Sequence, residues 1–291
     1  MKKKYFKTIA ILLLFFQHGF SQNYQKTNFG IKSKVGQVQI EIQFFSPETV
    51  RILKSPEGSS FTKKSISVIK EPVKTDIKIS EDENKISVQS SAVKVQLDTK
   101  TGKITYFNLQ GEQLFTEKDN GIKFTPVQDV DAKTFLVRQA FLLDKDEAIY
   151  GLGQHQNGMM NQRNQKLFLR QQNMQICIPF FQSIKGYGLF WDNYSPTTFA
   201  DNLQETSFES QVGDCADYYF MYGGNADGVI AQMRSLTGQV PMFPKWTFGY
   251  WQSRERYQTQ FEIVDVVKKY RNLKVPFDGV VQDWQYWSTD D

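Results

Sequence analysis

Histidine and cysteine are both scarce in this chain of 291 residues, which contains two of each. One histidine, His18, lies near the N-terminus, and His155 stands alone in the remainder. A single histidine cannot form a histidine-rich metal site, and it disfavours serine–histidine or cysteine–histidine catalysis. The sequence also lacks a Walker A motif, an HExxH motif and paired CxxC motifs. We therefore expect no metal and no cofactor, which leaves any chemistry to carboxyl, amide and aromatic side chains.

The two cysteines, Cys177 and Cys215, bear on the compartment and on how the chain is stabilised. A protein exported to an oxidising compartment could join them in a single disulfide. A chain of this length, however, buries enough apolar surface to fold without covalent cross-links. Because both cysteines lie in apolar segments typical of strands, buried free thiols are the expected state, and a single bridge is the alternative.

The formal net charge of +4 arises from four lysines near the N-terminus. Without Lys2, Lys3, Lys4 and Lys7 the chain has 31 basic and 31 acidic residues. A balanced charge does not support a nucleic-acid-binding surface, so we expect no nucleic-acid partner.

The same lysines precede an apolar run over residues 9–16 and small residues near Ser21. This order is typical of a secretory signal peptide, residues 1–21, with cleavage after Ser21. The alternative, a transmembrane anchor, needs about 20 apolar residues, and neither this run nor any later one is long enough. We expect an exported protein with no stable membrane span, located in the periplasm, secreted, or held at the cell surface.

Residues from 22 to about 222 show the two-residue period of half-buried strands. Apolar and polar residues alternate over 38–44 and again over 93–98. A turn at 101–103 leads into the apolar run 104–107, which predicts a hairpin. Turn residues recur about every 8–12 positions, a spacing typical of an antiparallel β-sandwich. The predicted fold class is mainly β, with a β-sandwich domain over residues 22–240.

The period then changes. Apolar residues recur at helical spacing over 229–236, with Asn225 as the expected cap and Gly238 as the end of the helix. Prolines follow at 241 and 244 and indicate a domain boundary.

Beyond the boundary the pattern is strand, helix, strand. The apolar run 246–251 predicts a strand, Thr259 and Glu262 form a capping box for a helix, and residues 277–283 predict a second strand. This succession opens a parallel β/α fold, but two strands cannot close a barrel or cover both faces of their sheet. We expect residues 241–291 to be the first β-α-β of a truncated (β/α)8 barrel.

Aromatic residues gather in this last segment, which holds four of the five tryptophans. Some of these rings are expected to pack in the core. Flat rings beside carboxylates and amides are also typical of sugar-binding sites. Asp283 ends the second predicted strand, and in (β/α)8 barrels the substrate residues stand at that end of the strands.

Four segments resemble signatures of glycoside hydrolase family 31, and they occur in that family's order. Residues 248–257 (FGYWQSRERY) and 281–287 (VQDWQYW) resemble the start of its catalytic barrel. Residues 150–154 (YGLGQ) and 186–193 (GYGLFWDN) resemble two signatures of its galactose-mutarotase-like β-sandwich. The details favour exported bacterial members of the α-xylosidase or α-glucosidase type.

The resemblance implies a retaining α-glycosidase that hydrolyses α-linked glucosides or xylosides in oligosaccharides or polysaccharides. Such enzymes use two carboxyl groups about 5–5.5 Å apart, one as nucleophile and one as acid. In this family both are aspartates on later barrel strands, so we assign no catalytic residue to this chain. The resemblance does imply substrate contacts for Asp283, which would hold sugar hydroxyls in the −1 subsite, and for Trp284, which would shape that subsite.

Other roles stay open for several residues. Asp283 could instead pair with Arg254 or Arg256 in a structural role. The family's sandwich also lends a loop to the substrate pocket, and residues 156–161 are the candidate here. His155 is expected to be a loop or packing residue.

A function of a different class also fits the sandwich, namely a non-catalytic carbohydrate-binding β-sandwich protein. The capped β/α unit argues against it, because a binding module would not need one. The sequence does not indicate an oligomeric state.

The expected absence of both catalytic carboxyl groups predicts that the 291-residue chain alone has no glycosidase activity. The purified chain, incubated with α-glucosides and α-xylosides, should release sugar no faster than buffer. A rate above that background would contradict the assignment of both carboxyl groups to later strands.

Overall fold

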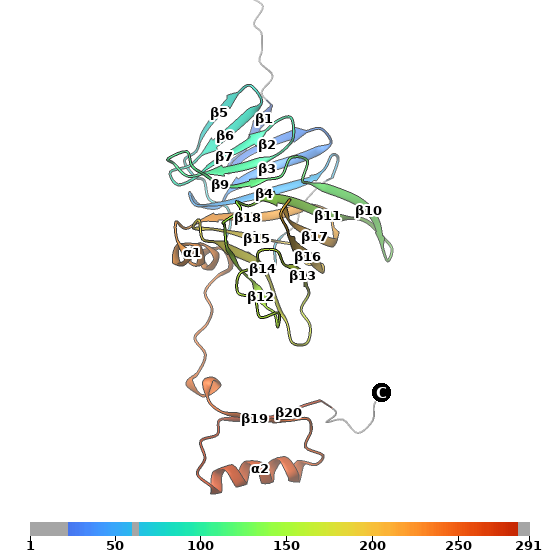
Figure 1. Cartoon of the computed structure of the whole chain (residues 1–291), viewed down its shortest axis with the longest axis vertical. Helices are drawn as coiled ribbons and strands as arrows, with labels where there is room; N and C mark the ends of the chain where they lie inside the picture. The colour runs from blue at the N-terminus through green and yellow to red at the C-terminus, as the bar shows by residue number, and fades with distance from the viewer. Residues whose placement is uncertain (1–22, 60–63, 285–291) are drawn as a thin grey trace, which may run out of the picture. The chain divides into compact units, whose positions relative to one another are not determined.

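The computed structural model describes residues 23–59 and 64–284, and its chain forms two compact units divided between Gly238 and Gln239 (Figure 1). The expected signal peptide, residues 1–21, lies outside the described residues and stays a prediction. The first unit is an antiparallel β-sandwich, as predicted, and the second is a small β-α-β unit.

Two antiparallel sheets form the sandwich. The strands of the smaller sheet are β1 (Tyr24–Lys26), β2 (Gly30–Val35), β3 (Val38–Phe44), β4 (Thr49–Pro56), β12 (Ile149–Gln154), β14 (Ile176–Ser183), β15 (Tyr187–Trp191) and β18 (Ala216–Tyr222). Their order in the sheet is β1-β2-β3-β4-β18-β15-β14-β12.

The strands of the larger sheet are β5 (Lys78–Asp82), β6 (Lys85–Gln89), β7 (Lys94–Asp98), β8 (Ile104–Phe107), β9 (Gln113–Glu117), β10 (Lys123–Asp129), β11 (Ala132–Leu142), β13 (Lys166–Leu169), β16 (Thr197–Asp201) and β17 (Thr206–Gly213). Their order is β13-β16-β17-β11-β9-β8-β7-β6-β5, and β10 pairs with β11. The predicted hairpin is confirmed as the antiparallel pair β7–β8.

The core lies between the two sheets, and the alternation of each strand decides which side chains reach it. In β3 the residues Ile40, Ile42 and Phe44 are buried, as the period of two predicts. Large aromatic rings fill the centre, where Tyr106 of one sheet stacks on Phe220 of the other with ring centroids 3.9 Å apart. Such stacking joins the sheets across the sandwich and excludes water from between them.

A charged pair lies inside this apolar core. Lys54 of β4 and Glu117 of β9 belong to different sheets, and both are buried. The Lys54 ammonium donates to a Glu117 carboxylate oxygen at 2.5 Å and to the Gly102 carbonyl at 2.8 Å. The same carboxylate accepts from the Ile104 amide at 2.7 Å and from the Tyr218 hydroxyl at 2.8 Å. Burial lowers the pKa of Lys54, an effect that Glu117 opposes.

Helix α1 (Ala226–Thr237) covers the outer face of the smaller sheet (Figure 1). Both of its predicted ends are confirmed: Asn225 Oδ1 accepts from the Gly228 amide at 2.9 Å, and the Gly238 amide donates to the Arg234 carbonyl at 2.8 Å. The packing of α1 on the smaller sheet also requires a glycine in β15, because a Cβ at Gly188 would lie 2.7 Å from a methyl carbon of Val229 in α1.

The YGLGQ segment forms a bulge in β12. The register of β12 with β14 shifts between Gly151 and Gly153, whose φ angles are +131° and +95°. A side chain at Gly153 would also collide with the Ile176 carbonyl. Glycine is therefore needed at both positions for the conformation of the bulge, because only glycine adopts such φ angles readily.

The second unit contains a 3₁₀ helix η1 (Lys245–Phe248), strand β19 (Trp251–Arg254), helix α2 (Gln260–Asn272) and strand β20 (Gly279–Gln282). The predicted parallel strand–helix–strand is confirmed. The strand expected over 246–251 is wrong, because the Pro244 carbonyl accepts from both the amide and the hydroxyl of Thr247 and folds this run into a 3₁₀ turn. A short apolar run does not by itself distinguish strand from helix.

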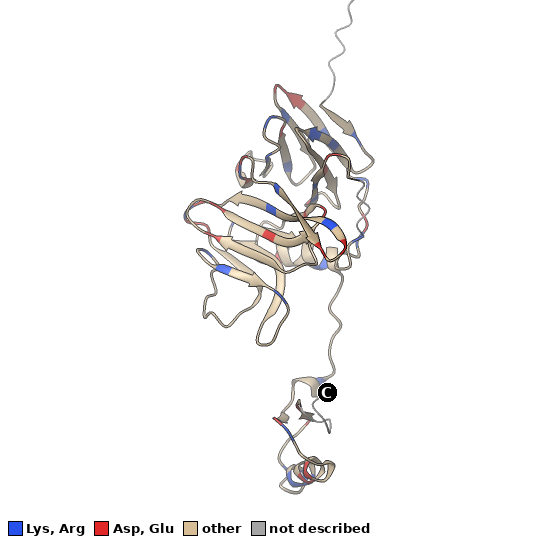
Figure 2. Cartoon of the chain, turned by 90° about the vertical axis from the view of Figure 1, so that its right-hand side faces the viewer, with Lys and Arg blue, Asp and Glu red and all other residues tan. Residues whose placement is uncertain are grey.

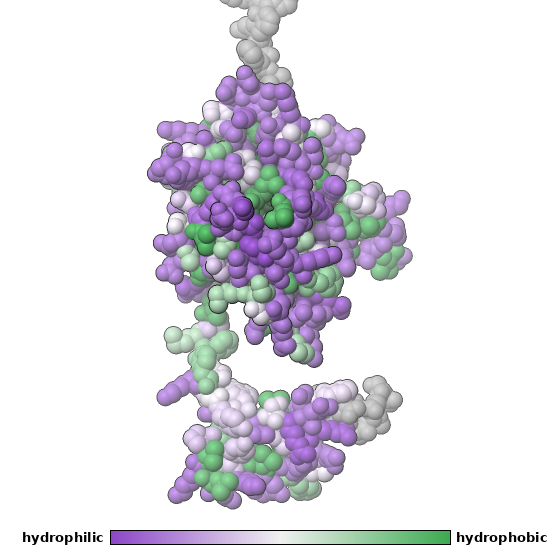
Figure 3. All heavy atoms as spheres, viewed as in Figure 1, coloured by the Kyte–Doolittle hydropathy of each residue, from purple (hydrophilic) through white to green (hydrophobic). Residues whose placement is uncertain are grey.

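The surfaces of the two units differ in composition. Acidic and basic residues are interspersed along the strands and loops of the sandwich (Figure 2), and the face of the sandwich seen in Figure 3 is largely hydrophilic. The second unit exposes large apolar side chains, as expected for two strands and one helix: Trp246, Phe248, Tyr250, Trp251, Phe261 and Val264. Within the described part of the chain, we find no helix that is long and apolar enough to cross a membrane.

Both cysteines are free thiols, as predicted. Cys215 is buried, whereas Cys177 is only half-buried, and burial raises the pKa of the Cys177 thiol.

Replacing Lys54 with Met leaves the charge of Glu117 in the core, and the free energy of unfolding should fall by about 3–5 kcal/mol. The double variant K54M/E117Q should recover much of this loss, because the neutral amide can accept from the Ile104 amide through its oxygen and donate to the Tyr218 hydroxyl through its nitrogen. Urea unfolding, monitored by near-ultraviolet circular dichroism, measures the free energy of unfolding of the single and the double variant. Lys34→Met is the control: its exposed pair with Glu57 should contribute less than about 1 kcal/mol. A double variant no more stable than K54M would contradict this account.

Candidate functional site

The parallel pairing of β19 and β20 brings two strand ends to one edge of their sheet. The register pairs Trp251 with Gly279 and Arg254 with Gln282, so both strands end at the same level. The residues that follow directly are Glu255 after β19, and Asp283 and Trp284 after β20. Substrate residues in β/α folds stand at this carboxyl edge.

Helix α2 and its cap hold the two strands together. The Thr259 hydroxyl accepts from the Glu262 amide at 3.2 Å, which confirms the first half of the predicted capping box. The Glu262 side chain accepts from the Gln258 amide at 2.8 Å and pairs with Arg254 at 2.8 Å. One carboxylate therefore ties the start of α2 to the end of β19.

The alternation of β19 separates a helix-facing side from an opposite side. The Gln252 side-chain oxygen accepts from the hydroxyls of Tyr250 and Tyr270, each at 2.7 Å, and Tyr270 lies on α2. Arg254 also faces this side, through Glu262. Because neighbouring residues of a strand alternate, and the parallel register pairs Gln252 with Val280, Asp283 belongs to the opposite side.

The structure brings the two sequence-predicted site residues together at this edge. Asp283 is exposed, and one of its carboxylate oxygens accepts from the Trp284 amide at 2.8 Å. Trp284 is 54% exposed, and its indole nitrogen donates to Glu255 at 2.9 Å. The structural alternative was a pairing of Asp283 with Arg254 or Arg256. The guanidinium of Arg254 pairs with Glu262, and the pairing with Arg256 stays a prediction.

Glu255 is the residue of this group that sequence reasoning missed. The Gln282 side chain accepts from the Tyr257 amide at 3.3 Å and donates to the Tyr257 carbonyl at 3.0 Å, which fastens the loop after β19 to the end of β20. Tyr257 is itself buried. The sequence held no signal for Glu255, because the strand predicted from it ended at residue 251. Only the position of β19 and its pairing with β20 show that Glu255 follows a strand and what it contacts.

Two further sequence predictions concern the sandwich. The loop 156–161 follows β12 and exposes Met159 and Met160; its part in a substrate pocket stays a prediction. The ring of His155 donates to the Leu152 carbonyl at 2.8 Å, as expected of a loop residue. Among the described residues, no group of three or more histidine, cysteine, aspartate or glutamate side chains could hold a metal ion.

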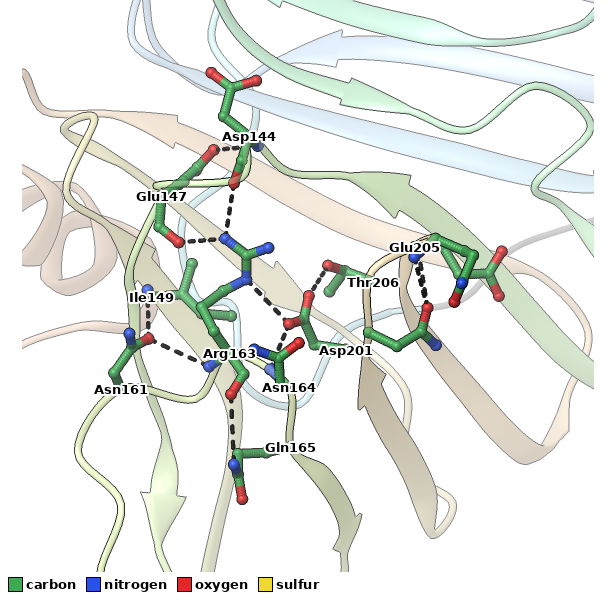
Figure 4. A network of polar contacts seen from close by, with 12 residues as sticks. Asp144, Glu147, Ile149, Asn161, Arg163, Asn164, Gln165, Asp201, Glu205 and Thr206 are labelled. Atoms are coloured by element: carbon green, nitrogen blue, oxygen red, sulfur yellow. Dashed lines mark hydrogen bonds and ion pairs between the residues drawn. The ribbon is translucent and has the colours of Figure 1, made fainter.

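A second polar cluster lies in the sandwich (Figure 4), and several of its residues line a cavity of about 400 Å³. At its centre Arg163 donates to Asp201 at 3.0 Å and to the Asp144 and Glu147 carbonyls. Asp201 in turn accepts from the Asn164 amide at 2.6 Å. These contacts join the loops around residues 144–147 and 163–164 to the end of β16, and we interpret the cluster as structural.

The antiparallel sandwich and the parallel β-α-β unit after it, with polar side chains where β19 and β20 end, are typical of one class of protein. In this class a galactose-mutarotase-like sandwich is followed by the start of a β/α barrel. Residues 39–200 match the glycosyl hydrolase 31 N-terminal galactose mutarotase-like domain, and residues 240–291 match the glycosyl hydrolases family 31 TIM-barrel domain. The first match alone covers more than half of the chain. The chain therefore belongs to glycoside hydrolase family 31.

Relatives of known name agree with this assignment. The chain is 37% identical to an α-xylosidase of Saccharolobus solfataricus in an alignment of 264 residues that covers 87% of this chain and 36% of the relative. It is 26% identical to α-glucosidase 2 of Bacillus thermoamyloliquefaciens, across 85% of this chain and 32% of the relative. The chain thus spans about a third of the length of these relatives.

Solved structures agree on the fold. A family 31 dextranase of Flavobacterium johnsoniae in complex with glucose superposes with a TM-score of 0.77 at 25% identity, covering 91% of this chain and 34% of the dextranase. A family 31 α-xylosidase of Xanthomonas citri superposes with a TM-score of 0.82 at 21% identity, covering 90% of this chain and 45% of the xylosidase.

The sandwich should lose stability in acid through Glu205, which pairs with Lys118 and Arg138. Burial by itself would raise the pKa of Glu205, but these two cations lower it below 4.5 overall. Its pairing therefore stabilises the fold above pH 4.5, the ordinary value, and is lost as the pH falls through the lower folded value.

Glu205→Gln should lower stability at pH 6 and make the decline toward pH 3 shallower. Urea unfolding at several pH values measures this slope. Glu71→Gln, which changes an exposed carboxylate, is the control. An unchanged slope in E205Q would show that Glu205 does not contribute to acid unfolding.

Proposed function

We propose that this chain provides the sandwich and the first sugar-binding residues of a retaining α-glycosidase that acts on α-linked xylosides or glucosides. The observation that carries the proposal is the placement of Asp283 and Trp284 side by side where β20 ends, in a chain that belongs to family 31. Relatives named α-xylosidase reach 37% identity and the relative named α-glucosidase 2 reaches 26%, which favours a xyloside.

The chemistry of the two residues suits a neutral sugar. An exposed carboxylate can accept hydrogen bonds from two adjacent hydroxyl groups, and charge-assisted bonds of this kind are stronger than neutral ones. An exposed indole offers a flat apolar face to the C–H groups of a pyranose ring. Asp283 would thus orient the sugar through its hydroxyls while Trp284 limits the space beside it.

The bond-breaking step would belong to other residues. A retaining mechanism needs two carboxyl groups about 5–5.5 Å apart, one to attack the anomeric carbon and one to protonate the leaving oxygen. The resemblance to family 31 puts both on later barrel strands. The role of the present residues is therefore binding, and the 291-residue chain by itself would be inactive.

In the full-length encoded protein, Asp283→Ala should lower kcat/KM for p-nitrophenyl α-xyloside at least about 100-fold, because it removes two charge-assisted hydrogen bonds worth about 3 kcal/mol together. Release of nitrophenol measures the rate. Asp265→Ala on the outer surface of α2 is the matched control and should leave the rate unchanged. Equal kcat/KM for D283A and the unmodified protein would refute the binding role of Asp283.

A further inference from the structure

Trp284 makes a side-chain hydrogen bond that the proposed sugar contact does not require. Its indole nitrogen donates to a carboxylate oxygen of Glu255 at 2.9 Å. The two residues are 29 positions apart in the sequence and come from the ends of different strands. The bond therefore joins the two neighbouring strand ends directly at the proposed site.

The main chain around Glu255 is anchored on both sides. Arg254 before it is held by Glu262, and Tyr257 after it is held by two hydrogen bonds to Gln282. Gln282 lies two residues before Trp284 on β20. The parallel pairing of β19 with β20 therefore sets the relative position of the main chain at Glu255 and at Trp284.

An exposed indole needs such a restraint if it is to contact a ligand in one orientation. With 54% of its surface exposed, the Trp284 ring is not enclosed by packing on all sides, and its side chain can adopt more than one staggered rotamer in principle. A hydrogen bond to an ionised acceptor is directional and favours the orientation in which the indole N–H points at the carboxylate. A ring ordered beforehand loses less entropy when a sugar binds.

We propose that Glu255 is a positioning residue of the sugar subsite, which holds the indole ring of Trp284 in its binding orientation through the N–H bond. The inference rests on the proposed role of Trp284 in sugar binding. Glu255 then acts on the sugar only through the ring, so its removal should weaken binding without changing the chemical step.

A spectroscopic test does not depend on activity. In a ¹H–¹⁵N spectrum of the full-length encoded protein, Trp284→Phe identifies the indole N–H signal of Trp284 by its disappearance. Glu255→Ala should move that signal upfield, as expected for the loss of an acceptor, and leave the other indole signals in place. Glu255→Gln, which keeps an acceptor oxygen, should move it less. An unmoved signal in E255A would overturn the proposal.

A double-variant cycle tests the consequence for sugar binding. E255A should raise KM for the α-xyloside about tenfold with kcat little changed, consistent with the loss of one hydrogen bond to a charged group. In a W284F background, which lacks the indole N–H, E255A should have no further effect. The same loss in both backgrounds would show that Glu255 does not act through Trp284. Asp265→Ala serves as the control.

The two proposals fail in different ways. If D283A and W284F both leave kcat/KM unchanged, the sugar subsite itself is wrongly placed. If those variants lower kcat/KM but E255A does not, the subsite stands and the role given to Glu255 is wrong.

Discussion

A buried ion pair between the two sheets constrains how they face each other in the sandwich. Lys54 comes from one sheet and Glu117 from the other, and the carboxylate also binds the amide of Ile104 and the hydroxyl of Tyr218. Removing either charge would leave the other uncompensated in a medium that solvates charge poorly. An arrangement of the sheets that separates these two charges is therefore unfavourable, and the observed arrangement also stacks Tyr106 on Phe220 in the core.

The proposed site depends on a different constraint, the parallel register of β19 and β20. That register places the residues after both strands at one edge, so that Glu255 and Trp284 meet although 29 positions separate them. The capping of α2 and the pair of Glu262 with Arg254 keep the connection compact. Family membership supports the placement of Asp283 there, since matching domains continue from the sandwich into a barrel.

Local patterns predicted local structure well. Asn225 and Thr259 were expected to cap helices, and both do, because a capping side chain binds an amide only two or three residues away. The alternation of β3 and the hairpin β7–β8 followed from a period that the pleat itself imposes. The run 246–251 was misread as a strand, because an apolar stretch after a proline suits a 3₁₀ turn as well, and the hydrogen bonds of Thr247 decide between them.

The sequence by itself determined the fold class, the β/α unit after the sandwich and the position of Asp283 and Trp284 after a strand. These depend on periodicity, turn residues and short motifs, which act over a few positions of the chain. Only the tertiary structure decided that Lys54 is buried against Glu117, that Arg254 is paired with Glu262, and that Glu255 binds the indole of Trp284. Each of these joins residues from different strands or helices, and which side chains meet follows from the register and facing of those elements.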